Sequence, residues 1–474
     1  MRLNSISIAL LLVACSSTPV LPPIVITPAA TGPKINVWLT TSERTSLLSP
    51  VSSITFKKEA ALSTLISVDT TIRFQSMDGF GYTLTGGSAQ LINTKMNAAI
   101  RTALLKELFT TEQNGIGVSY LRISIGASDL DDHVFSYNDL ATGQTDVGLT
   151  KFSIDEDRKN LIPVLKEIVA LFPQIKIMGT PWSAPVWMKT NNLSKGGSLK
   201  TEYYTVYANY LIKYIQAMAQ EGITIDAITP QNEPEHPGNN PSMTMTSSEQ
   251  NTFIKSHLSP ALKAAGLSTK IVLYDHNCDH PNYPISILDD SQTKPLVDGS
   301  AFHLYAGDIS ALSTVHTAHP DKNVYFTEQW TSGNGNFGGD LRWHVKNLIV
   351  GAPRNWSKNV LEWNLAADEN LQPHTDGGCT LCLGALTITS AGTTTRNVSY
   401  YIIGHASKFV PPGSVRIQSN VTDNLYNVAF VTPTGKKVLI VVNDTNEFKS
   451  FSIGYKDMSA SASLPAGAVA TYVW

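Results

Sequence analysis

Two glutamates stand in sequence settings where a carboxylate could do chemistry. Glu233 follows Asn232 within the stretch Thr229–Pro234, and Glu328 lies within Tyr325–Trp330. Hydrolysis of an acetal needs two carboxyl groups, because one must donate a proton to the leaving oxygen while the other, ionised, attacks or stabilises the carbon. A single glutamate in such a position more often caps a helix or pairs with an arginine. The interpretation therefore depends on whether folding brings both side chains to one place.

The elements that must position these glutamates alternate in type between about Met77 and Ala366, where short apolar runs are separated by longer stretches with apolar residues at helical spacing. The eight runs are Gln75–Leu84, Val118–Gly126, Ile175–Thr180, Asp226–Pro230, Lys270–Asp275, Gly299–Tyr305, Asn323–Thr327 and Asn359–Leu365. The helix-like stretches include Asn93–Phe109, Arg158–Leu171, Thr201–Gln220 and Ser248–Ala265. Eight strand–helix repeats predict an α/β fold, the closed (β/α)₈ TIM barrel.

A doubly wound open sheet is the competing arrangement. It usually carries a glycine-rich loop after its first strand, and Gly86 and Gly87 lack the third spaced glycine. In a barrel the active site lies at the C-terminal ends of the strands. Glu233 follows the fourth run and Glu328 follows the seventh, so both are expected at the barrel mouth. A separation of about 5–5.5 Å is the geometry of hydrolases that retain the anomeric configuration, and there the charge of one carboxylate raises the pKa of the other.

The rest of the chain has a different pattern. From about Ser399, strand-like runs alternate with turn residues. These runs are Val415–Gln418, Leu425–Val431, Lys437–Asn443, Phe448–Ile453 and Ala468–Val473, and two N-terminal runs, Ile35–Leu39 and Ser53–Val68, are expected to join them. We therefore predict N-terminal strands in residues 35–70, the barrel in residues 71–398, and a small antiparallel β-sandwich side domain in residues 399–474.

The first residues resemble an export signal. Met1–Leu3 supplies a basic start, and Ile6–Ala14 is mostly apolar but too short to span a bilayer, which needs about 20 apolar residues. The segment Leu12–Cys15 resembles the lipobox of bacterial lipoproteins, in which the cysteine carries the lipid. This implies a lipoprotein signal peptide in residues 1–15, lipidation of Cys15, a tether in residues 16–34, and export to the bacterial cell envelope, either the outer membrane surface or the periplasm. An ordinary signal peptide that contains a cysteine is the alternative.

Three further cysteines lie in the body of the chain. Cys379 and Cys382 follow the turn-like stretch Asp376–Gly378, and in an oxidising compartment they could close a small disulfide loop. A zinc site would need a second pair of ligands, and a redox centre of the thioredoxin kind would place the pair before a helix. We therefore interpret the pair as a local structural disulfide, which leaves Cys278 as a buried thiol.

Composition argues against some classes of partner. The 474 residues include 35 Lys and Arg against 38 Asp and Glu, a formal net charge of −3. This balance gives no electrostatic reason to expect nucleic acid or an anionic membrane surface, so membrane contact is expected only through the N-terminal lipid. Proton transfer and glycosyl exchange use side chains and water, so we expect no cofactor and no metal. We expect a monomer.

Several motifs together resemble one family of enzymes. Asn232–Pro234 after the fourth run and a glutamate after the seventh look like the large barrel clan of retaining glycosidases. The stretches Asp78–Gly81, Thr180–Asn191 and Ser407–Ser414 resemble glycoside hydrolase family 30, which includes lysosomal glucosylceramidase and microbial β-1,6-glucanases. The likeness covers nearly the whole chain after the tether, and it implies a barrel with a side β domain.

The resemblance implies roles for the two glutamates and their immediate neighbours. Glu233 would be the general acid/base and Glu328 the nucleophile. Asn232 would hydrogen-bond the sugar 2-hydroxyl, an interaction that strengthens as the ring becomes oxocarbenium-like. Tyr305 would hold the nucleophile in place.

The resemblance also implies a wall and a support for the sugar site. Trp182 and Trp363 would line the sugar-binding subsite, although both could simply pack the top of the barrel. Arg122 would support the carboxylates, although it could be a purely structural ion-pair partner. His303 is expected to stand behind the catalytic groups rather than to act as a catalyst.

One departure bears on the substrate. Glucosylceramidase-like members carry an aspartate that grips the terminal glucose, and we place Gly86 at the matching position. A missing carboxylate suits a site with room for a continuing chain, and the stretches Phe80–Gly87 and Asn232–Ser242 resemble the β-1,6-glucanase branch. We therefore predict an endo-β-1,6-glucanase acting on a β-glucan polysaccharide or oligosaccharide. The alternatives are an exo-β-glucosidase, a glucosylceramidase or a β-xylosidase of the same family, or a non-catalytic surface glycan-binding lipoprotein.

Overall fold

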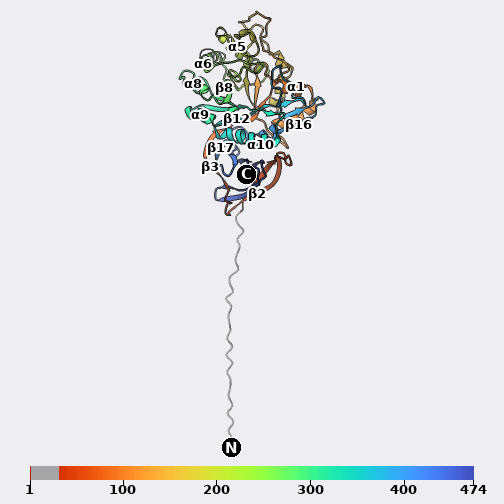
Figure 1. Ribbon diagram of the computed structural model, residues 1–474, viewed down its shortest axis with the longest axis vertical. Coiled ribbons are helices and arrows are strands. Elements are labelled where there is room, and N and C mark those ends of the chain that lie inside the picture. Colours follow the sequence, from red (N-terminus) through yellow and green to blue (C-terminus); the bar gives the residue numbers. More distant parts are fainter. Residues whose placement is uncertain (2–30) are drawn as a thin grey trace.

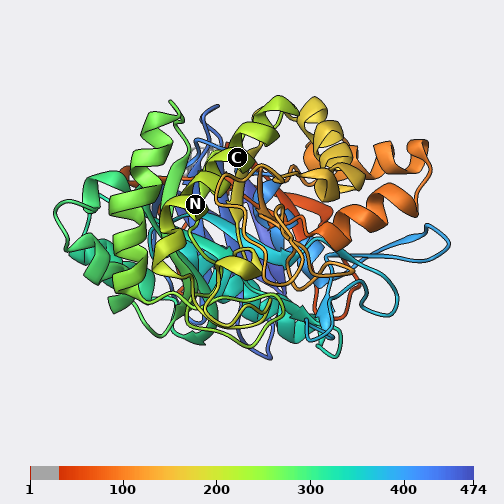
Figure 2. The ribbon, with the colours of Figure 1, turned by 90° about the horizontal axis from the view of Figure 1, so that it is seen from above.

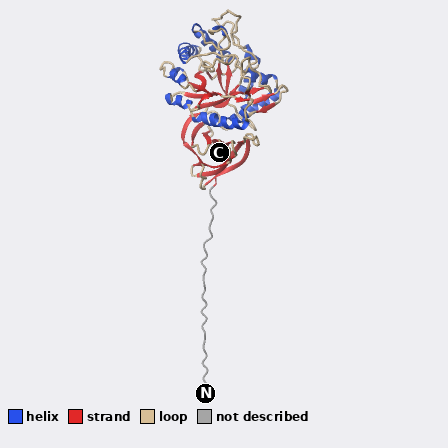
Figure 3. Ribbon diagram, viewed as in Figure 1, coloured by secondary structure: helices blue, strands red, loops and turns tan. Residues whose placement is uncertain are grey.

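The computed structural model describes Met1 and residues 31–474, and it has two parts, a barrel and a smaller β domain packed against it (Figure 1 and Figure 3). The barrel strands are parallel and pair in chain order, with β12 closing the ring between β10 and β4. They are β4 Gly79–Thr83, β5 Tyr120–Ser124, β6 Lys176–Thr180, β7 Ala227–Ile228, β8 Lys270–Cys278, β9 Gly299–Gly307, β10 Asn323–Glu328 and β12 Ser357–Asn364. Each predicted run overlaps one of these strands, so the predicted (β/α)₈ barrel is confirmed.

Helices cover the outside of the barrel (Figure 2). They are α1 Gly86–Thr94, α2 Ala98–Phe109, α3 Asp155–Lys159, α4 Leu161–Leu171, α5 Tyr204–Gln220, α6 Ser247–Phe253, α7 Ser259–Ala264, α8 Asn282–Leu288, α9 Ala311–Ala318, α10 Phe337–His344, α11 Ala352–Arg354 and α12 Val398–Ser407, with π-helical segments η3 Ile254–Leu258 and η5 Val345–Gly351 and 3₁₀ turns η1 Val186–Met188, η2 Thr201–Tyr203 and η4 Lys294–Leu296. Helix α5 illustrates why they form: Tyr207, Leu211, Tyr214 and Met218 recur at helical spacing and all are fully buried.

A layer of apolar side chains fills the barrel interior. It takes one residue from each of seven strands: Tyr120, Met178, Ala227, Val272, Ala301, Tyr325 and Leu361. A filled interior is typical of this barrel, which is a packed core and not a pore. The layer therefore forms a floor on which the next layer of inward-facing side chains rests.

The side domain is a nine-stranded β structure whose strand order closes on itself, β1-β2-β21-β20-β3-β17-β18-β19-β22. Its strands are β1 Thr31–Thr40, β2 Ser49–Lys57, β3 Leu65–Ser76, β17 Val415–Ser419, β18 Leu425–Val431, β19 Lys437–Asn443, β20 Lys449–Tyr455, β21 Met458–Leu464 and β22 Val469–Val473. Its pairs are antiparallel except β3 with β20, which is parallel. Strand β3 comes from the N-terminal segment and lies between β17 and β20. The predicted single run Ser53–Val68 is two strands separated by a turn.

The predicted boundary between residues 398 and 399 is misplaced. It falls at the start of α12, which packs mainly on the barrel elements β4, β12, α10 and η5. The helix also contacts the side domain, where His405 hydrogen-bonds Thr471 of β22 and Thr40 of β1. All ten residues of α12 are buried, because the helix lies between barrel and side domain. The barrel therefore extends through Ser407, and the side domain resumes at β17.

Most of the predicted export segment lies outside the described residues. This applies to the signal peptide, to Cys15 and to the tether up to residue 30. Residues 31–34, predicted as the end of the tether, already belong to β1. Among the described residues, no helix is long and apolar enough to cross a membrane.

Candidate active site

A polar layer lies on the apolar floor inside the barrel. Side chains along a strand alternate between its two faces, so a residue two positions after an inward-facing one also faces inward. Tyr120 and Ala301 of the floor are thus followed by Arg122 on β5 and His303 on β9. Asp275 on β8 lies beside them, and Arg122, His303 and Asp275 are completely buried. Charged groups in such a position need partners, and they find them in one another and in the two glutamates.

The two glutamates meet above this layer. Glu328 ends β10 and Glu233 lies in the loop after β7, and they are 5% and 7% exposed. One carboxylate oxygen of each lies within 4.8 Å of the other and of a ring nitrogen of His303. Glu233 has a φ of 43°, a left-handed conformation that is held by a hydrogen bond from its N–H to the carbonyl of Asp275, 3.0 Å away. The separation matches the retaining geometry of about 5–5.5 Å and is too short for the about 6.5–9.5 Å of inverting enzymes.

Arg122 connects the carboxylates. Its Nη1 donates to Glu328 Oε2, and its Nη2 donates to Asp275 Oδ2 at 2.9 Å and to Asn232 Oδ1 at 2.6 Å. The guanidinium also lies over the ring of Trp182, 4.7 Å from the centroid. A guanidinium suits this place because its planar donors serve several acceptors at once.

His303 and Asp275 support Glu233 from below. Burial lowers the pKa of His303, but the charges of Glu328, Asp275 and Glu233 outweigh burial and raise that pKa to about 9. Burial raises the pKa of Asp275, but Arg122 and His303 outweigh it and hold that pKa well below its ordinary value. His303 is therefore an imidazolium at neutral pH, and it donates from Nε2 to Asp275 Oδ1 at 3.1 Å and from Nδ1 to Glu233 Oε1 at 3.2 Å.

The two glutamates compete for one proton. Burial raises the pKa of Glu328, the charge of Glu233 adds to this rise, and His303 and Arg122 oppose it. Burial also acts to raise the pKa of Glu233, but the imidazolium of His303 lowers it. Carboxyl groups this close titrate as one pair. Because burial and mutual repulsion both disfavour two negative charges here, we expect the pair to keep one proton at a pKa above that of an ordinary glutamic acid.

Glu233, His303 and Glu328 are also the one group among the described residues whose atoms are spaced as metal ligands could be. A histidine ligand must offer an unprotonated nitrogen. Both ring nitrogens of His303 instead face carboxylates, and its pKa is raised to about 9. The group therefore fits proton transfer better than metal binding.

The remaining predicted residues surround the carboxylates. The Tyr305 hydroxyl donates to Glu328 Oε1 at 2.9 Å, and Asn232 is fixed by its contact with Arg122. Trp182 and Trp363 stack with ring centroids 5.3 Å apart and planes inclined by 27°. Every predicted site residue within the described part of the chain thus lies in one cluster or on its rim, including the two cysteines, which are described below.

A pocket of about 260 Å³ opens above the cluster. Its lining consists of Asp129, Trp182, Glu233, His236, Asn239, His276, Asn277, Tyr305, Glu328, Trp330, Trp363, Cys379 and Cys382. Aromatic walls with a few convergent polar groups are typical of small-molecule sites. The lining combines flat apolar faces with carboxylates, which suits a sugar ring that has apolar faces and hydroxyl edges.

The comparison with known families agrees with this geometry. A model described as the glycosyl hydrolase family 30 TIM-barrel domain matches residues 77–410, and one described as the family 30 beta sandwich domain matches residues 413–472. The chain belongs to glycosyl hydrolase family 30. The end of the barrel match at residue 410 agrees with the assignment of α12 to the barrel.

Three curated endo-1,6-beta-D-glucanases match the chain at 32–38% identity, and glucosylceramidases match it at 26–28%. The chain is 33% identical over 427 residues to endo-1,6-beta-D-glucanase neg1 of Aspergillus fumigatus, covering 84% of this chain and 85% of that protein. It is 38% identical over 355 residues to an endo-1,6-beta-D-glucanase of Neurospora crassa, covering 72% of each. Among solved structures, the endo-beta1,6-glucanase BT3312 superposes with a TM-score of 0.87 at 34% identity, covering 93% of this chain and 99% of that one.

Sequence reasoning missed several residues of the family 30 pocket. Asp275 ends the fifth predicted run, so the strand-end rule that found the glutamates could have found it. Asp129 has no such signal, because it lies in the loop after β5 and not at a strand end. Its side chain is 4% exposed because segments distant in the sequence pack around it. Burial raises its pKa to about 7, and Glu328 adds to the rise. The other missed lining residues are His236, Asn239, His276, Asn277 and Trp330.

Asp131 fills the space beside Gly86. A Cβ atom at Gly86 would lie 1.6 Å from Asp131 Oδ1, so the space there is already filled and not open for a substrate chain. Asp131 is itself buried and accepts hydrogen bonds from the N–H and hydroxyl of Ser128. The carboxylate that reaches the pocket is Asp129, in the same loop. The pocket therefore has a carboxyl group, that of Asp129, besides the two glutamates.

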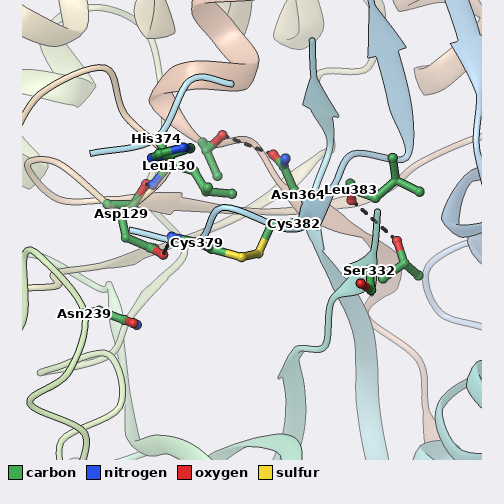
Figure 4. The surroundings of a disulfide bond; sticks show 12 residues. Asp129, Leu130, Asn239, Ser332, Asn364, His374, Cys379, Cys382 and Leu383 are labelled. Atoms are coloured by element: carbon green, nitrogen blue, oxygen red, sulfur yellow. Dashed lines mark hydrogen bonds between the residues drawn. A yellow bond between two sulfur atoms is a disulfide. The ribbon is translucent and has the colours of Figure 1, made fainter. Parts of the chain in front are cut away.

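The predicted pairing of Cys379 with Cys382 is present as a disulfide (Figure 4). Cys278 is a buried free thiol. The sequence predicts a structural disulfide without placing it near the active site. Both cysteines in fact border the pocket. Cys382 begins β14 (Cys382–Leu383), which pairs with β11 (Thr331–Ser332) directly after the Glu328 strand.

Replacing Arg122 by Met should lower the free energy of unfolding by about 3–5 kcal/mol, because it removes the guanidinium that contacts buried Asp275 and Glu328 and leaves His303 as their one cationic neighbour in the network. Urea unfolding followed by circular dichroism measures the change. Arg101→Met is the matched control, since Arg101 pairs with Glu167 near the surface, where such a pair contributes about 0–1 kcal/mol. Equal losses in the two variants would contradict the network described here.

Proposed function

We propose that the chain is a retaining β-glucan hydrolase, an endo-β-1,6-glucanase, that works by double displacement with Glu233 as acid/base and Glu328 as nucleophile. The observation that carries this mechanism is the approach of their carboxylate oxygens to within 4.8 Å in a pocket lined by tryptophans. The fixed separation leaves no room for a water between the sugar and Glu328, so direct attack is favoured over water activation.

The first step breaks the glycosidic bond. Protonated Glu233 gives its proton to the departing glycosidic oxygen, and the Glu328 carboxylate forms a bond to the anomeric carbon from the opposite face. In the second step Glu233, now ionised, takes a proton from water, whose oxygen attacks the anomeric carbon and releases Glu328. Two inversions leave the configuration unchanged, and both glutamates return to their starting state.

The contacts fit this division of labour. Glu328 accepts from the Arg122 guanidinium and the Tyr305 hydroxyl, both of which favour its anion. In the free site burial raises the pKa of Glu328 and the His303 imidazolium lowers the pKa of Glu233, so the proposed mechanism requires the shared proton to move to Glu233 when the sugar binds. When Glu328 becomes an ester, its charge disappears, and His303 then stabilises the Glu233 anion that must act as base. His303 is thus a positioning residue, which agrees with its expected role.

The sugar contacts are proposed on the same basis. The stacked pair of Trp182 and Trp363 offers an aromatic wall to the ring, and Asn232, anchored by Arg122, is placed to hold the 2-hydroxyl. Asp129 adds a carboxylate on another side of the pocket. These groups hold a single ring against the two glutamates, which is the orientation that lowers the barrier.

The linkage is proposed from the relatives, since enzymes named endo-1,6-β-glucanase match this chain over most of its length. The test compares pustulan (a β-1,6-glucan), laminarin (a β-1,3-glucan) and an aryl β-glucoside. We expect rapid loss of pustulan chain length, with β-1,6-linked oligosaccharides as early products. Release of glucose alone, and only from the aryl glucoside, would overturn the endo-1,6 assignment.

An exo-acting glucosidase is the second candidate. The observation that favours it is that Asp129 and the disulfide cysteines line the pocket and are joined by a hydrogen bond, so this side of the pocket offers a fixed wall to the sugar. The same panel separates the two, because an exo enzyme shortens pustulan one glucose at a time and leaves its viscosity high.

Asp129→Asn should raise the KM for pustulan about tenfold, the effect of one hydrogen bond to a charged group, while making the protein more stable at pH 8. Folded Asp129 has a pKa of about 7, so the folded form holds its proton more tightly than the unfolded form. Ionisation of Asp129 therefore costs more in the folded form than in the unfolded form, and it lowers the free energy of unfolding as pH rises from about 4 to about 7. Asparagine does not ionise, so the variant keeps this stability at pH 8. Melting temperatures at pH 4 and pH 8 measure the difference, which should vanish at pH 4. Asp132→Asn, an exposed neighbour, should change neither property.

We also propose that the protein is exported and held by a lipid on Cys15, and that it is a monomer. The support for the anchor is the sequence of residues 1–15, which lie almost entirely outside the described part of the chain. Labelling cells with an alkyne fatty acid should mark the wild type and not Cys15→Ala, and the variant should leave the membrane fraction. Equal labelling of both would contradict the anchor, and light scattering on the soluble variant tests the monomer.

A further inference from the structure

The Cys379–Cys382 disulfide lies in the wall of the sugar pocket (Figure 4). Cys382 is 4% exposed and packs in one small apolar cluster with Trp182, Trp363 and Leu130. Cys379 is half-buried and packs against the same cluster. A crosslink between residues so close in sequence constrains little of the unfolded chain, so its main effect is local.

Cys379 makes a direct contact with the pocket carboxylate. Its backbone N–H donates to Asp129 Oδ2 at 3.2 Å. Burial raises the pKa of Asp129 and Glu328 adds to the rise, while this hydrogen bond opposes both. The position of the Cys379 backbone therefore determines where the Asp129 carboxylate sits and how readily it ionises.

The segment that carries the disulfide joins two loops of the active site. The Thr375 N–H donates to the Asp129 carbonyl at 2.9 Å, and the Thr375 hydroxyl donates to the Asn240 carbonyl. Asn240 in turn donates from Nδ2 to the Asp376 carbonyl at 2.8 Å. Residues 375–382 thus bridge the loop after β5, which carries Asp129, and the loop after β7, which carries Glu233.

The bridge passes very close to Asp129. A Cβ atom at Gly378 would lie 2.3 Å from the Asp129 carbonyl oxygen, so the backbone there can approach only because the residue is glycine. At its other end the segment enters β14, which is fixed by pairing with β11. The disulfide connects this fixed end, at Cys382, to the residue that contacts Asp129, at Cys379.

We propose that the Cys379–Cys382 disulfide positions Asp129 and so sets how tightly the enzyme holds the sugar, without taking part in proton or glycosyl transfer. This inference rests on the function proposed above for the pocket. Reduction of the disulfide should remove this positioning of Asp129. A dithiol reductant gives two electrons to the disulfide, the S–S bond breaks, both cysteines become thiols, and the reductant closes its own disulfide.

The first test measures kcat and KM on pustulan for the oxidised enzyme, the dithiothreitol-reduced enzyme, and the double variant Cys379→Ser/Cys382→Ser. We expect KM to rise about tenfold in both altered forms, with kcat within about twofold, because one hydrogen bond to a charged group weakens and the glutamates are untouched. Reoxidation should restore KM. An unchanged KM, or a fall in kcat alone, overturns the proposal.

A double-mutant cycle separates positioning from general loosening of the fold. In the Asp129→Asn background, reduction should change KM less than about twofold, because the group through which the disulfide acts is gone. A tenfold rise in both backgrounds would mean that the disulfide acts through something else. Cys278→Ala, which removes the buried free thiol, should keep the full response to the reductant.

A second readout does not depend on turnover. Both cysteines border the pocket, so a bound sugar should shield them from the reductant. With Glu328→Gln, which should bind without cleaving, a β-1,6-linked glucose oligomer should slow the appearance of thiols severalfold. Unchanged reduction despite measured binding counts against the proposal. If the oxidised wild type hydrolyses no β-glucan, the proposed function fails as well; if it hydrolyses pustulan and ignores reduction, only this inference fails.

Discussion

Glu328→Gln is expected to lower kcat on pustulan by a factor on the order of 10⁴ or more, because an amide cannot form the bond to the anomeric carbon and the losses for a nucleophile are of this size. Initial rates of reducing-end release measure it. Gln has the shape of Glu but a single acceptor oxygen, so it keeps the hydrogen bond from Arg122 and loses the one from Tyr305, which reaches the other oxygen of Glu328. The pocket should persist, and the variant should still bind the glucan.

Glu235→Gln is the matched control. Glu235 lies two residues from the proposed acid/base but pairs with His280 outside the pocket, so its loss should leave kcat within about twofold. Binding of pustulan by Glu328→Gln, measured by calorimetry, distinguishes an enzyme from a glycan-binding protein. If Glu328→Gln hydrolyses pustulan at the wild-type rate, Glu328 is not the nucleophile.

Glu233→Ala is expected to lower kcat on pustulan by about 10²–10⁴, the usual contribution of general acid–base catalysis. The loss should be much smaller for the first step on an aryl glucoside, because a good leaving group departs without a proton. The second step still lacks its base, so the glycosyl-enzyme should accumulate and appear as a burst of the aryl alcohol. Stopped-flow absorbance measures the burst.

Azide provides the decisive check on Glu233. A small anion can occupy the space left by the removed carboxylate and attack the anomeric carbon without a base, giving a β-glucosyl azide and a faster turnover. The same treatment should not rescue Glu328→Gln by this route, since that variant forms no glycosyl-enzyme. Loss of equal size on pustulan and on the aryl glucoside, with no burst, would contradict the acid/base role.

Much of the fold could be predicted because its signals are local. The barrel strands are buried on both faces, so each appears in the sequence as a short apolar run. In the side domain, β18 and β19 span the same residues as the runs predicted for them. Strand β21, Met458–Leu464, was missed because it consists largely of alternating Ser and Ala, which carry little hydrophobic signal. Helix α12 was read as part of the β domain because it is buried all round and shows little amphipathic pattern.

The site divides in a similar way. Glu233 and Glu328 could be predicted because strand ends in a barrel converge by topology, and motif resemblance then supplied Arg122, Tyr305 and the two tryptophans. Asp129 could not, because it reaches the pocket from a long loop whose path is set by contacts with Thr375 and Cys379 far along the chain. The filling of the space beside Gly86 could not be predicted for the same reason, since it depends on the position of Asp131 in a neighbouring loop.

The closed order of the side domain has a consequence for how this protein is made. Strand β1 lies between β2 and β22, with Asn36 opposite Val473, so one of its two neighbours is the last strand of the chain. At about 5–20 residues per second, a ribosome needs roughly 20–100 s to synthesise a chain of this length. During that interval most partner strands of β1, β2 and β3 have not been synthesised. Their unpaired backbone N–H and C=O groups could then pair with another nascent chain. The amino-terminal segment therefore either stays unfolded or needs a chaperone until translation is nearly finished.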